Sequence, residues 1–186
     1  HMAEYTPYFI KRQELIDRFD VPIDEYIRRS EKNLEQFSET KAKIDKGEDF
    51  EVEKSHEYGA PIIHSIETGI PRVVWGNVLN THLITNLPNN ACVEVPCLVS
   101  KAGIQPCYVG NLPPQLAAMN MTNINVQQLT VEAALTGNID YVYQAVMLDP
   151  HTSSVLSLDE IWRMTKELIE AHANLLPKFT KGRHLA

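Results

Sequence analysis

Neutral amide side chains dominate the part of the chain whose residue types are best suited to binding chemistry. Between Val73 and Val131 only Glu94 and Lys101 carry a formal charge, although charged residues make up 22% of the sequence. The same stretch holds nine asparagines, at positions 77, 80, 86, 89, 90, 111, 120, 123 and 125. Because an amide donates and accepts hydrogen bonds at a lower desolvation cost than a charge, this composition suits binding to a sugar, a cofactor or another protein surface.

Three amides of this stretch follow helical spacing. Asn120, Asn123 and Gln127 recur at i, i+3 and i+7, in a run that begins at Pro113 and Pro114 and ends at Gly137. The spacing predicts a long helix with one neutral polar side, which we call the amide stripe. We interpret the amide stripe as a contact with a domain or subunit rather than a sugar site, because an interface without charges avoids a large desolvation cost.

The familiar self-contained motifs are absent from the sequence. There is no glycine-rich dinucleotide or phosphate loop, no HExxH and no GxSxG. The seven histidines show no ligand spacing. Cys92, Cys97 and Cys107 lack the paired spacing of a zinc site, so we predict reduced, mostly buried thiols of a structural kind. No dinucleotide site of its own is therefore predicted for the chain.

The helices and strands that position these amide side chains are typical of an α+β domain. Hydrophobic spacing predicts an amphipathic helix over 22–46, a shorter one over 56–68 and a last helix after Ser157. Ser157 and Glu160 form a capping box, and the expected buried face of that helix is Ile161, Met164, Leu168 and Ile169. Strands are expected over 72–78, 92–99 and 107–109. We predict helices packed on a small, mostly antiparallel sheet.

Composition excludes several classes of partner. The 186 residues fit one domain, and a net charge of −7 argues against nucleic acid or an anionic membrane surface as partner. No apolar run approaches the roughly 20 residues of a membrane span, and no signal-peptide pattern opens the chain, so a cytoplasmic protein is expected. His1 before Met2 suggests a cloning remnant, and a native His1 stays open.

Several ordered blocks then carry a family resemblance. They are GNVLNTHLITNLP at 76–88, CVEVP at 92–96, GIQP at 103–106, LPPQL at 112–116, TVEAA at 130–134 and LDPHT at 148–152. In this order and spacing they resemble the carboxy-terminal domain of glycoside hydrolase family 4. AEYTPYF at 3–9 resembles the segment before this domain in the α-galactosidase and α-glucosidase-like branch. The likeness spans nearly the whole chain.

The resemblance implies a two-part enzyme of which residues 1–186 are the second part. The family's carboxy-terminal domain is related to that of lactate and malate dehydrogenases, and an amino-terminal Rossmann domain holds NAD and the manganese-binding Cys and His. NAD and Mn²⁺ are thus implied for the full-length enzyme, and neither is expected to bind this chain alone. The implied partners are an α-glycoside substrate, the missing Rossmann domain and further copies in a homo-oligomer.

The family's reaction also follows from the resemblance. NAD oxidises the sugar at C3, manganese polarises the new carbonyl, and a base removes the C2 proton before the leaving group departs; water then adds and the hydride returns. A ketone beside C2 acidifies its hydrogen, and a Lewis acid stabilises the resulting anion. This is the NAD-dependent exception to the two-carboxylate rule for glycosidases. The absence of a catalytic carboxylate pair is consistent with it.

Tyr5 is the candidate catalytic base, because its place in the motif resembles that of the tyrosine proposed as C2 base in related phosphoglycosidases. Tyrosine ordinarily has a pKa of about 10, so a tyrosine base needs a cationic neighbour. The alternative is an aromatic anchor of the chain start beside Tyr8 and Phe9. A native His1 would be a weaker candidate in the same segment.

Asn77 and Asn80 are the candidate substrate-binding residues, as amides that could bond to sugar hydroxyls. The alternative for both is turn chemistry, because Asn stabilises turns through hydrogen bonds to nearby backbone. Three neighbours depart from the family pattern: His82 stands where a small residue is expected, Leu79 where proline is expected, and Ser100 where aspartate is expected. These departures leave the sugar unassigned. Glu94 is expected on a wet side of the sheet or paired with Arg72.

Two function classes remain open. The first is the carboxy-terminal substrate and oligomerisation domain of an NAD- and Mn-dependent α-glycosidase, active only with its Rossmann domain. The second is a catalytically inert binding or oligomerisation module. In either case we expect the chain to fold, to associate with itself and to leave glycosides uncleaved when it is alone.

Overall fold

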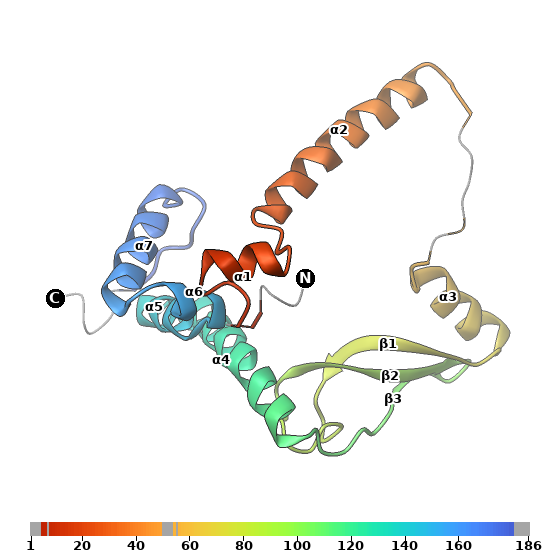
Figure 1. The fold of residues 1–186 in the computed structure, drawn as a ribbon. Coiled ribbons are helices and arrows are strands. Elements are labelled where there is room, and N and C mark those ends of the chain that lie inside the picture. Colours follow the sequence, from red (N-terminus) through yellow and green to blue (C-terminus); the bar gives the residue numbers. More distant parts are fainter. Residues whose placement is uncertain (1–4, 7, 50–53, 55, 181–186) are drawn as a thin grey trace.

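A three-stranded sheet and seven helices make up the described part of the chain. The structure is a computed structural model that describes all residues except 1–4, 7, 50–53, 55 and 181–186 (Figure 1). His1 and Met2 therefore lie outside the described residues. The helices are α1 (Gln13–Arg18), α2 (Glu25–Asp45), α3 (Gly59–Thr68), α4 (Pro114–Thr136), α5 (Ile139–Leu148), α6 (Pro150–Val155) and α7 (Leu158–Ala171), and the strands are β1 (Arg72–Leu79), β2 (Cys92–Ser100) and β3 (Gly103–Pro106).

The sheet is antiparallel throughout, in the order β1-β2-β3. β1 pairs with β2 from Arg72 opposite Val99 to Leu79 opposite Cys92. The predicted fold, helices packed on a small antiparallel sheet, is confirmed. The strand expected over 107–109 is wrong: β3 ends at Pro106, and the chain then turns toward the loop after β1, where the Val109 amide donates to the Leu83 carbonyl at 2.9 Å.

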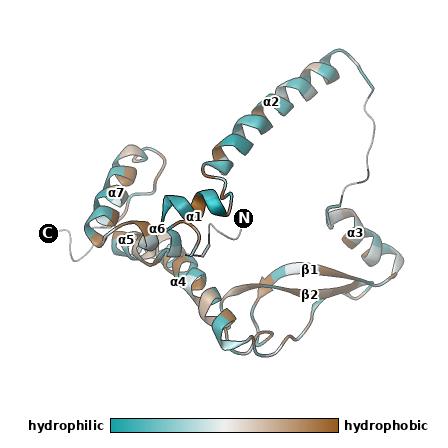
Figure 2. Cartoon of the chain, viewed as in Figure 1, coloured by the Kyte–Doolittle hydropathy of each residue, from teal (hydrophilic) through white to brown (hydrophobic). Residues whose placement is uncertain are grey.

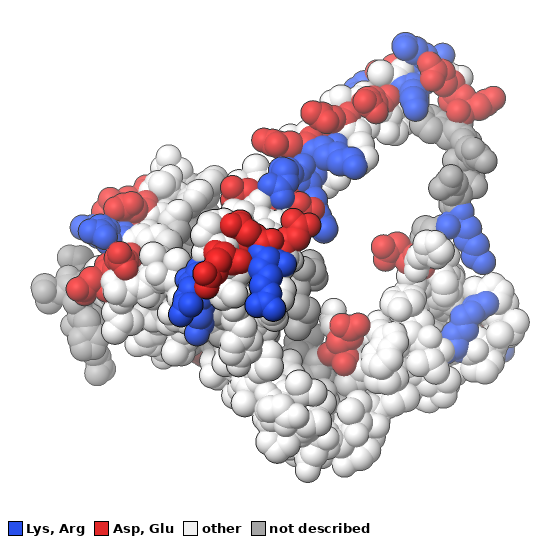
Figure 3. Space-filling model, viewed as in Figure 1, with Lys and Arg blue, Asp and Glu red and all other residues white. Residues whose placement is uncertain are grey.

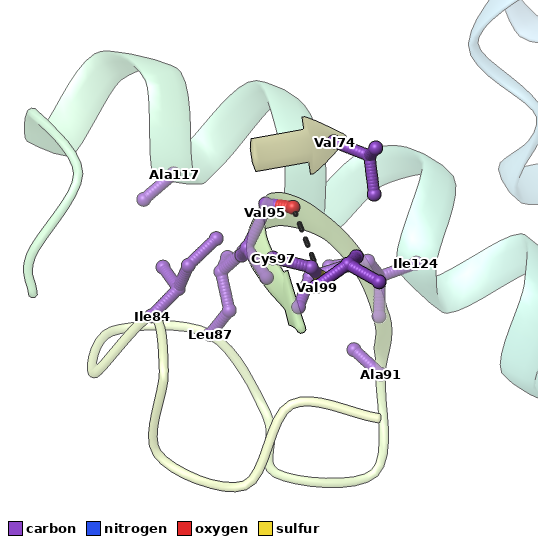
Figure 4. Packing of buried hydrophobic residues seen from close by; sticks show 10 residues of the cluster. Val74, Ile84, Leu87, Ala91, Val95, Cys97, Val99, Ala117 and Ile124 are labelled. Carbon is purple, nitrogen blue, oxygen red and sulfur yellow. Dashed lines mark hydrogen bonds between the residues drawn. The ribbon is translucent and has the colours of Figure 1, made fainter. Parts of the chain in front are cut away.

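One hydrophobic core lies on the inner face of the sheet. Val93, Val95, Cys97 and Val99 alternate inward along β2 and are almost fully buried. They pack with Val74 of β1, with the loop residues Ile84, Leu87 and Ala91, and with Ala117 and Ile124 of α4 (Figure 4). The predicted role of Cys97 as a small core residue is confirmed, whereas Cys92 is exposed and Cys107 is half-buried.

The outer face of the same sheet is apolar and exposed. Val73, Trp75 and Leu79 of β1 and Leu98 of β2 keep between 36% and 62% of their surface open. Because opposite residues of an antiparallel pair share a face, Leu98 lies beside Val73. Figure 3 shows that Lys, Arg, Asp and Glu side chains gather over the helices, while the region of the sheet is nearly free of them. Apart from Glu94, which lies opposite Asn77 on this face, the face has the composition of a surface that contacts another protein surface.

Helix α2 extends away from the rest of the molecule (Figure 1). The predicted amphipathic helix is confirmed, although it begins at Glu25 because Asp24 takes a left-handed conformation with φ 59°. No residue of α2 is buried, and apolar side chains such as Tyr26 and Phe37 are 83% and 68% exposed. Figure 2 shows α2 as a mostly hydrophilic helix with a few hydrophobic positions. Among the described residues no helix is long and apolar enough to cross a membrane.

The carboxy-terminal helices form a second, smaller packing unit. The Tyr143 ring of α5 stacks on Trp162 of α7 with 4.0 Å between ring centroids, beside the fully buried Ile161. Burial raises the pKa of Tyr143, and the Glu170 carboxylate adds to the effect. Helices α5 and α6 were not expected from the sequence. Side chains cap both: Asn138 accepts from the Asp140 amide at 3.0 Å, and Asp149 from the Thr152 amide at 2.7 Å.

The predicted capping box of α7 is confirmed. The Ser157 backbone amide donates to the Glu160 carboxylate at 2.8 Å, and the Ser157 hydroxyl donates to it at 2.7 Å. These two bonds hold the pKa of Glu160 below its usual range. The expected buried face is right for Ile161 and wrong for Leu168, which is 49% exposed. The helix ends at Ala171.

Candidate functional site

The loop between β1 and β2 is organised by one buried asparagine. Asn80 has no exposed surface, and its Nδ2 donates to the carbonyls of Ile84, Leu87 and Pro88 at 2.9, 3.1 and 3.0 Å. Its Oδ1 accepts from the Ile84 amide at 2.9 Å. The side chain thus substitutes for regular backbone pairing through the turn. The loop side chains are thereby held against the core (Figure 4).

A reciprocal pair of bonds joins this loop to the start of α4. Asn86 Nδ2 donates to the Leu112 carbonyl at 2.8 Å, and the Leu112 amide donates to Asn86 Oδ1 at 2.9 Å. Pro113 and Pro114 follow directly. A proline at the first helical position favours the helix start because its ring fixes φ near the helical value. The direction in which α4 leaves the sheet is therefore determined by the loop.

A groove of about 550 Å³ lies between the start of β2, the first half of α4 and the amino-terminal segment. The amide stripe supplies one wall, and Asn123 Nδ2 contacts the Tyr5 carbonyl at 3.4 Å. Thr6 beside Tyr5 is buried, whereas the Tyr5 side chain is 48% exposed. We call this the amide groove; its lining residues are Tyr5, Thr6, Glu94, Leu112, Leu116, Met119, Asn120, Asn123 and Gln127.

Glu94 is the only formally charged side chain among the described residues that line the amide groove. It is exposed, as expected, but it does not pair with Arg72, the alternative that the sequence suggested. Arg72 instead binds helix α3, where its Nη1 contacts His64 Nδ1 at 2.8 Å, the Ser65 hydroxyl at 3.1 Å and the Pro61 carbonyl at 3.3 Å. No ion pair joins Glu94 to any residue of the described chain.

The structure separates the three residues predicted to act on the substrate. Tyr5 lines the amide groove. Asn77 lies directly opposite Glu94 in the β1–β2 ladder, so the two side chains share the outer face of the sheet, but Asn77 does not line the groove. The Asn80 amide is fully buried and bonded to backbone, which is the arrangement that the turn alternative predicts.

Sequence reasoning placed the amide stripe at a domain or subunit contact and gave Glu94 little weight. The structure places Glu94, all three stripe residues and Tyr5 around the same groove. Glu94 lies within the CVEVP block of the family resemblance, but that block assigns it no role, and its position relative to α4 depends on the sheet and the loop together. The one usable signal was its isolation, because it is one of two formal charges between Val73 and Val131.

Side chains able to bind a metal are dispersed over the described residues. No group of three His, Cys, Asp or Glu side chains gathers anywhere in the described ranges. The amide groove holds one carboxylate and neutral amides, and no glycine-rich turn precedes a helix at its edge. No chemical step is therefore assigned to a cofactor held by these residues.

The comparisons with known proteins identify the family. Residues 1–152 match the family 4 glycosyl hydrolase C-terminal domain. The chain is 50% identical over 181 residues to an alpha-galactosidase from Bacillus subtilis (strain 168), which covers 96% of this chain and 42% of the relative. The chain belongs to glycosyl hydrolase family 4. It spans less than half the length of that relative, and the part it matches is the carboxy-terminal domain of the family 4 enzymes.

Solved family 4 structures have the same fold. A 6-phospho-alpha-glucosidase from gut microorganisms, in complex with NAD and glucose-6-phosphate, superposes with a TM-score of 0.74 at 18% identity and covers 93% of this chain and 40% of its own. A structure of a 6-phospho-alpha-glucosidase with NAD and Mn²⁺ gives a TM-score of 0.65 at 21% identity, over 84% of this chain and 34% of that one. At these identities the likeness establishes the fold of this family 4 domain.

His82 illustrates how this family 4 domain departs from the pattern expected at the sequence level. A small residue was expected there, and the structure gives His82 a φ of 61°, a conformation that glycine adopts without strain. Its Nε2 lies 3.1 Å from Asn89 Nδ2 in the same loop. This side-chain contact is one that a small residue could not make.

Proposed function

We propose that this chain is the substrate-binding, carboxy-terminal part of an α-galactosidase-like family 4 glycosidase, and that Tyr5 removes the C2 proton of the sugar. The observation that carries the proposal is the placement of Tyr5 on the amide groove, beside neutral amides suited to sugar hydroxyls. A general base must lie within hydrogen-bond reach of the proton that it removes. A sugar bound in the groove would meet the half-exposed Tyr5 side chain at one end.

The chain's own residues bind and orient the sugar in this proposal. Asn123 contacts the Tyr5 carbonyl, so it supports the backbone that carries the base. Asn120 donates to the Leu116 carbonyl at 3.0 Å through Nδ2, which directs its acceptor oxygen away from that bond. In the full-length enzyme, NAD and Mn²⁺ bound by an amino-terminal domain would supply the redox and Lewis-acid chemistry.

The proposal predicts no hydrolysis by the chain alone. Purified chain supplied with NAD, Mn²⁺, a thiol and p-nitrophenyl α-galactoside should release no nitrophenol above the background rate. Addition of the amino-terminal domain of the Bacillus subtilis relative, which is 50% identical over the matched region, should restore release. The amino-terminal domain alone is the control. Turnover by the pure chain, or no turnover by the mixture after both parts are shown to bind each other, would contradict the proposal.

A binding or oligomerisation module is the second candidate function. Its supporting observation is the apolar outer face of the sheet, where Trp75 and Leu79 are more than half exposed, together with the exposed apolar side chains of α2. Surfaces of this kind are normally covered in a working protein. The two candidates are compatible, because a family 4 domain can hold its substrate and also contact other chains.

Self-association is the measurable consequence of these exposed faces. Sedimentation velocity at rising protein concentration should show a dimer or larger species. Replacement of Trp75 and Leu79 by Ser and Thr should shift the distribution toward monomer, since both side chains lie on the outer face and the buried core is left unchanged. Replacement of Tyr108, which is 71% exposed outside that face, is the matched control. A strict monomer at the highest concentration would rule out the module candidate.

A further inference from the structure

We propose that α2 pairs with α2 of a second copy of this chain, in antiparallel orientation, through one narrow apolar seam. The inference rests on the second candidate function, association between copies, and is independent of the catalytic proposal. Four side chains of the seam keep more than half of their surface exposed, namely Ile27, Leu34, Phe37 and Ile44. No residue of α2 is buried, and the helix extends away from the rest of the molecule (Figure 1). The described chain therefore leaves this seam uncovered.

The spacing of the four apolar side chains indicates that their partner is another helix. A helix that packs on a broad protein surface usually has three or four apolar positions in every two turns, whereas a coiled-coil seam has two in every seven residues. In α2 the four apolar residues are separated by seven, three and seven positions. Ser30 and Lys41 occupy the remaining two positions of the seam. Such a narrow seam matches the width of a single helix.

A second copy of α2 is the helix that fits this seam. Helices α3 to α7 each bury side chains within the chain, and α1 has only six residues. In the part of the chain that the structure describes, α2 is therefore the one long helix without a packing partner. Its 21 residues span about 31 Å, which accommodates all six seam positions.

The seam has the same spacing when it is read in either direction. Its positions, 27, 30, 34, 37, 41 and 44, are separated by three, four, three, four and three residues. An antiparallel pair centred between positions 35 and 36 therefore places Ile27 of one copy against Ile44 of the other. By the same rule Leu34 meets Phe37. Because each contact occurs twice in a symmetric dimer, four of the six layers are apolar.

Lys41 disfavours the parallel alternative. In a parallel pair each seam residue meets its own equivalent, so two Lys41 ammonium groups would face each other in one layer. In the antiparallel pair Lys41 meets Ser30 of the second copy. The Ser30 hydroxyl donates to the Tyr26 carbonyl at 2.9 Å, so its oxygen can still accept a hydrogen bond from the ammonium group.

The other charges of α2 also favour the antiparallel pair. Residues 25–34 contain three basic and two acidic side chains, and residues 35–45 contain two basic and three acidic ones. The first half of one helix, with a net charge of +1, thus lies along the second half of the other, with a net charge of −1. The helix dipoles are opposed in this arrangement, which is the favourable orientation for neighbouring helices.

Disulfide cross-linking tests both the partner and its direction. In a chain whose exposed Cys92 is replaced by Ser, Ile27→Cys and Ile44→Cys are made separately and are oxidised either alone or as a mixture. The mixture should give a covalent dimer, because positions 27 and 44 of different copies lie opposite each other. Each variant alone should give at least about tenfold less, since 17 residues of helix separate the two equivalent thiols by about 26 Å.

Seam variants test the strength of the pairing by sedimentation velocity. Ser30→Leu with Lys41→Leu makes every layer apolar and should lower the Kd of the dimer at least about tenfold. Leu34→Asp with Phe37→Asp places carboxylates in the central layers and should raise the Kd at least about tenfold. Glu39→Leu adds the same apolar side chain outside the seam and is the matched control, with a Kd within about twofold of the unmodified chain.

The outcomes separate this inference from the other proposals. Cross-linking by each variant alone, no cross-linking in the mixture, or an unchanged Kd in both seam variants would overturn the antiparallel pairing of α2. A cross-link in the mixture that persists after Trp75→Ser and Leu79→Thr would support it even if the outer face of the sheet makes no contact. Nitrophenol release by the chain with the amino-terminal domain tests the catalytic proposal independently.

Discussion

Replacement of Tyr5 by phenylalanine is expected to lower kcat of the reconstituted glycosidase about a hundred- to ten-thousandfold, the range over which a general base typically contributes. The ring stays and only the hydroxyl is lost, so sugar binding and KM should change little. A substrate carrying deuterium at C2 should show a larger isotope effect on kcat in the variant, because slower proton removal makes that step limiting. Steady-state rates with both substrates provide the measurement.

Tyr8→Phe is the matched control for Tyr5. Tyr8 belongs to the same segment, is 57% exposed, and makes an edge contact with Phe9 at 6.4 Å between ring centroids. Its hydroxyl can be removed without change to the amide groove, so kcat should stay within about twofold of the unmodified chain. If Tyr5→Phe keeps full activity while Tyr5→Ala unfolds the amino-terminal segment, then Tyr5 is an aromatic anchor and the catalytic proposal is wrong.

Replacement of Asn80 by leucine should destabilise the domain by about 3 kcal/mol or more. The variant would leave the carbonyls of Ile84, Leu87 and Pro88 and the Ile84 amide without their partner in a buried turn. Each buried group that loses its hydrogen bond costs about 1–3 kcal/mol, and local relaxation recovers part of the total. Urea unfolding followed by circular dichroism gives the free energy of unfolding.

Asn77→Leu provides the comparison for Asn80→Leu, since it makes the same chemical change three residues earlier on the exposed face of β1. Its effect should lie within about 0.5 kcal/mol, as for other surface substitutions. Equal stability losses in the two variants would show that the hydrogen bonds of Asn80 contribute nothing specific. A destabilised Asn80 variant should also lose the amide groove, because the loop that it holds is bonded to the start of α4 through Asn86 and Leu112.

The elements predicted correctly from the sequence are those with strong local signals. The alternation in β2, the two prolines at the start of α4, the glycine after it and the capping box of α7 each determine structure over a few residues. Helices α5 and α6 were missed because α5 is apolar on most sides and shows no clear period, although the Asp149–Pro150 pair is a recognisable helix start. The mistaken strand over 107–109 contains strand-forming residues that pair with a loop instead.

The candidate site was only partly predictable, for a different reason. Tyr5 came from a family resemblance and the amide stripe from helical spacing, and each was found without the other. Their proximity to Glu94 depends on the loop that Asn80 holds and on the angle at which α4 leaves the sheet. These are contacts between segments far apart in the sequence, and neither composition nor periodicity reports them.

The reciprocal bonds between Asn86 and Leu112 also bear on the thermodynamics of binding. They join the start of α4 to the loop after β1, and the same core packs β2 against α4, so both sides of the groove are held in place by contacts within the chain. Binding then costs little backbone entropy. The weak hydrogen bonds to a neutral sugar therefore do not have to offset the cost of ordering the groove walls.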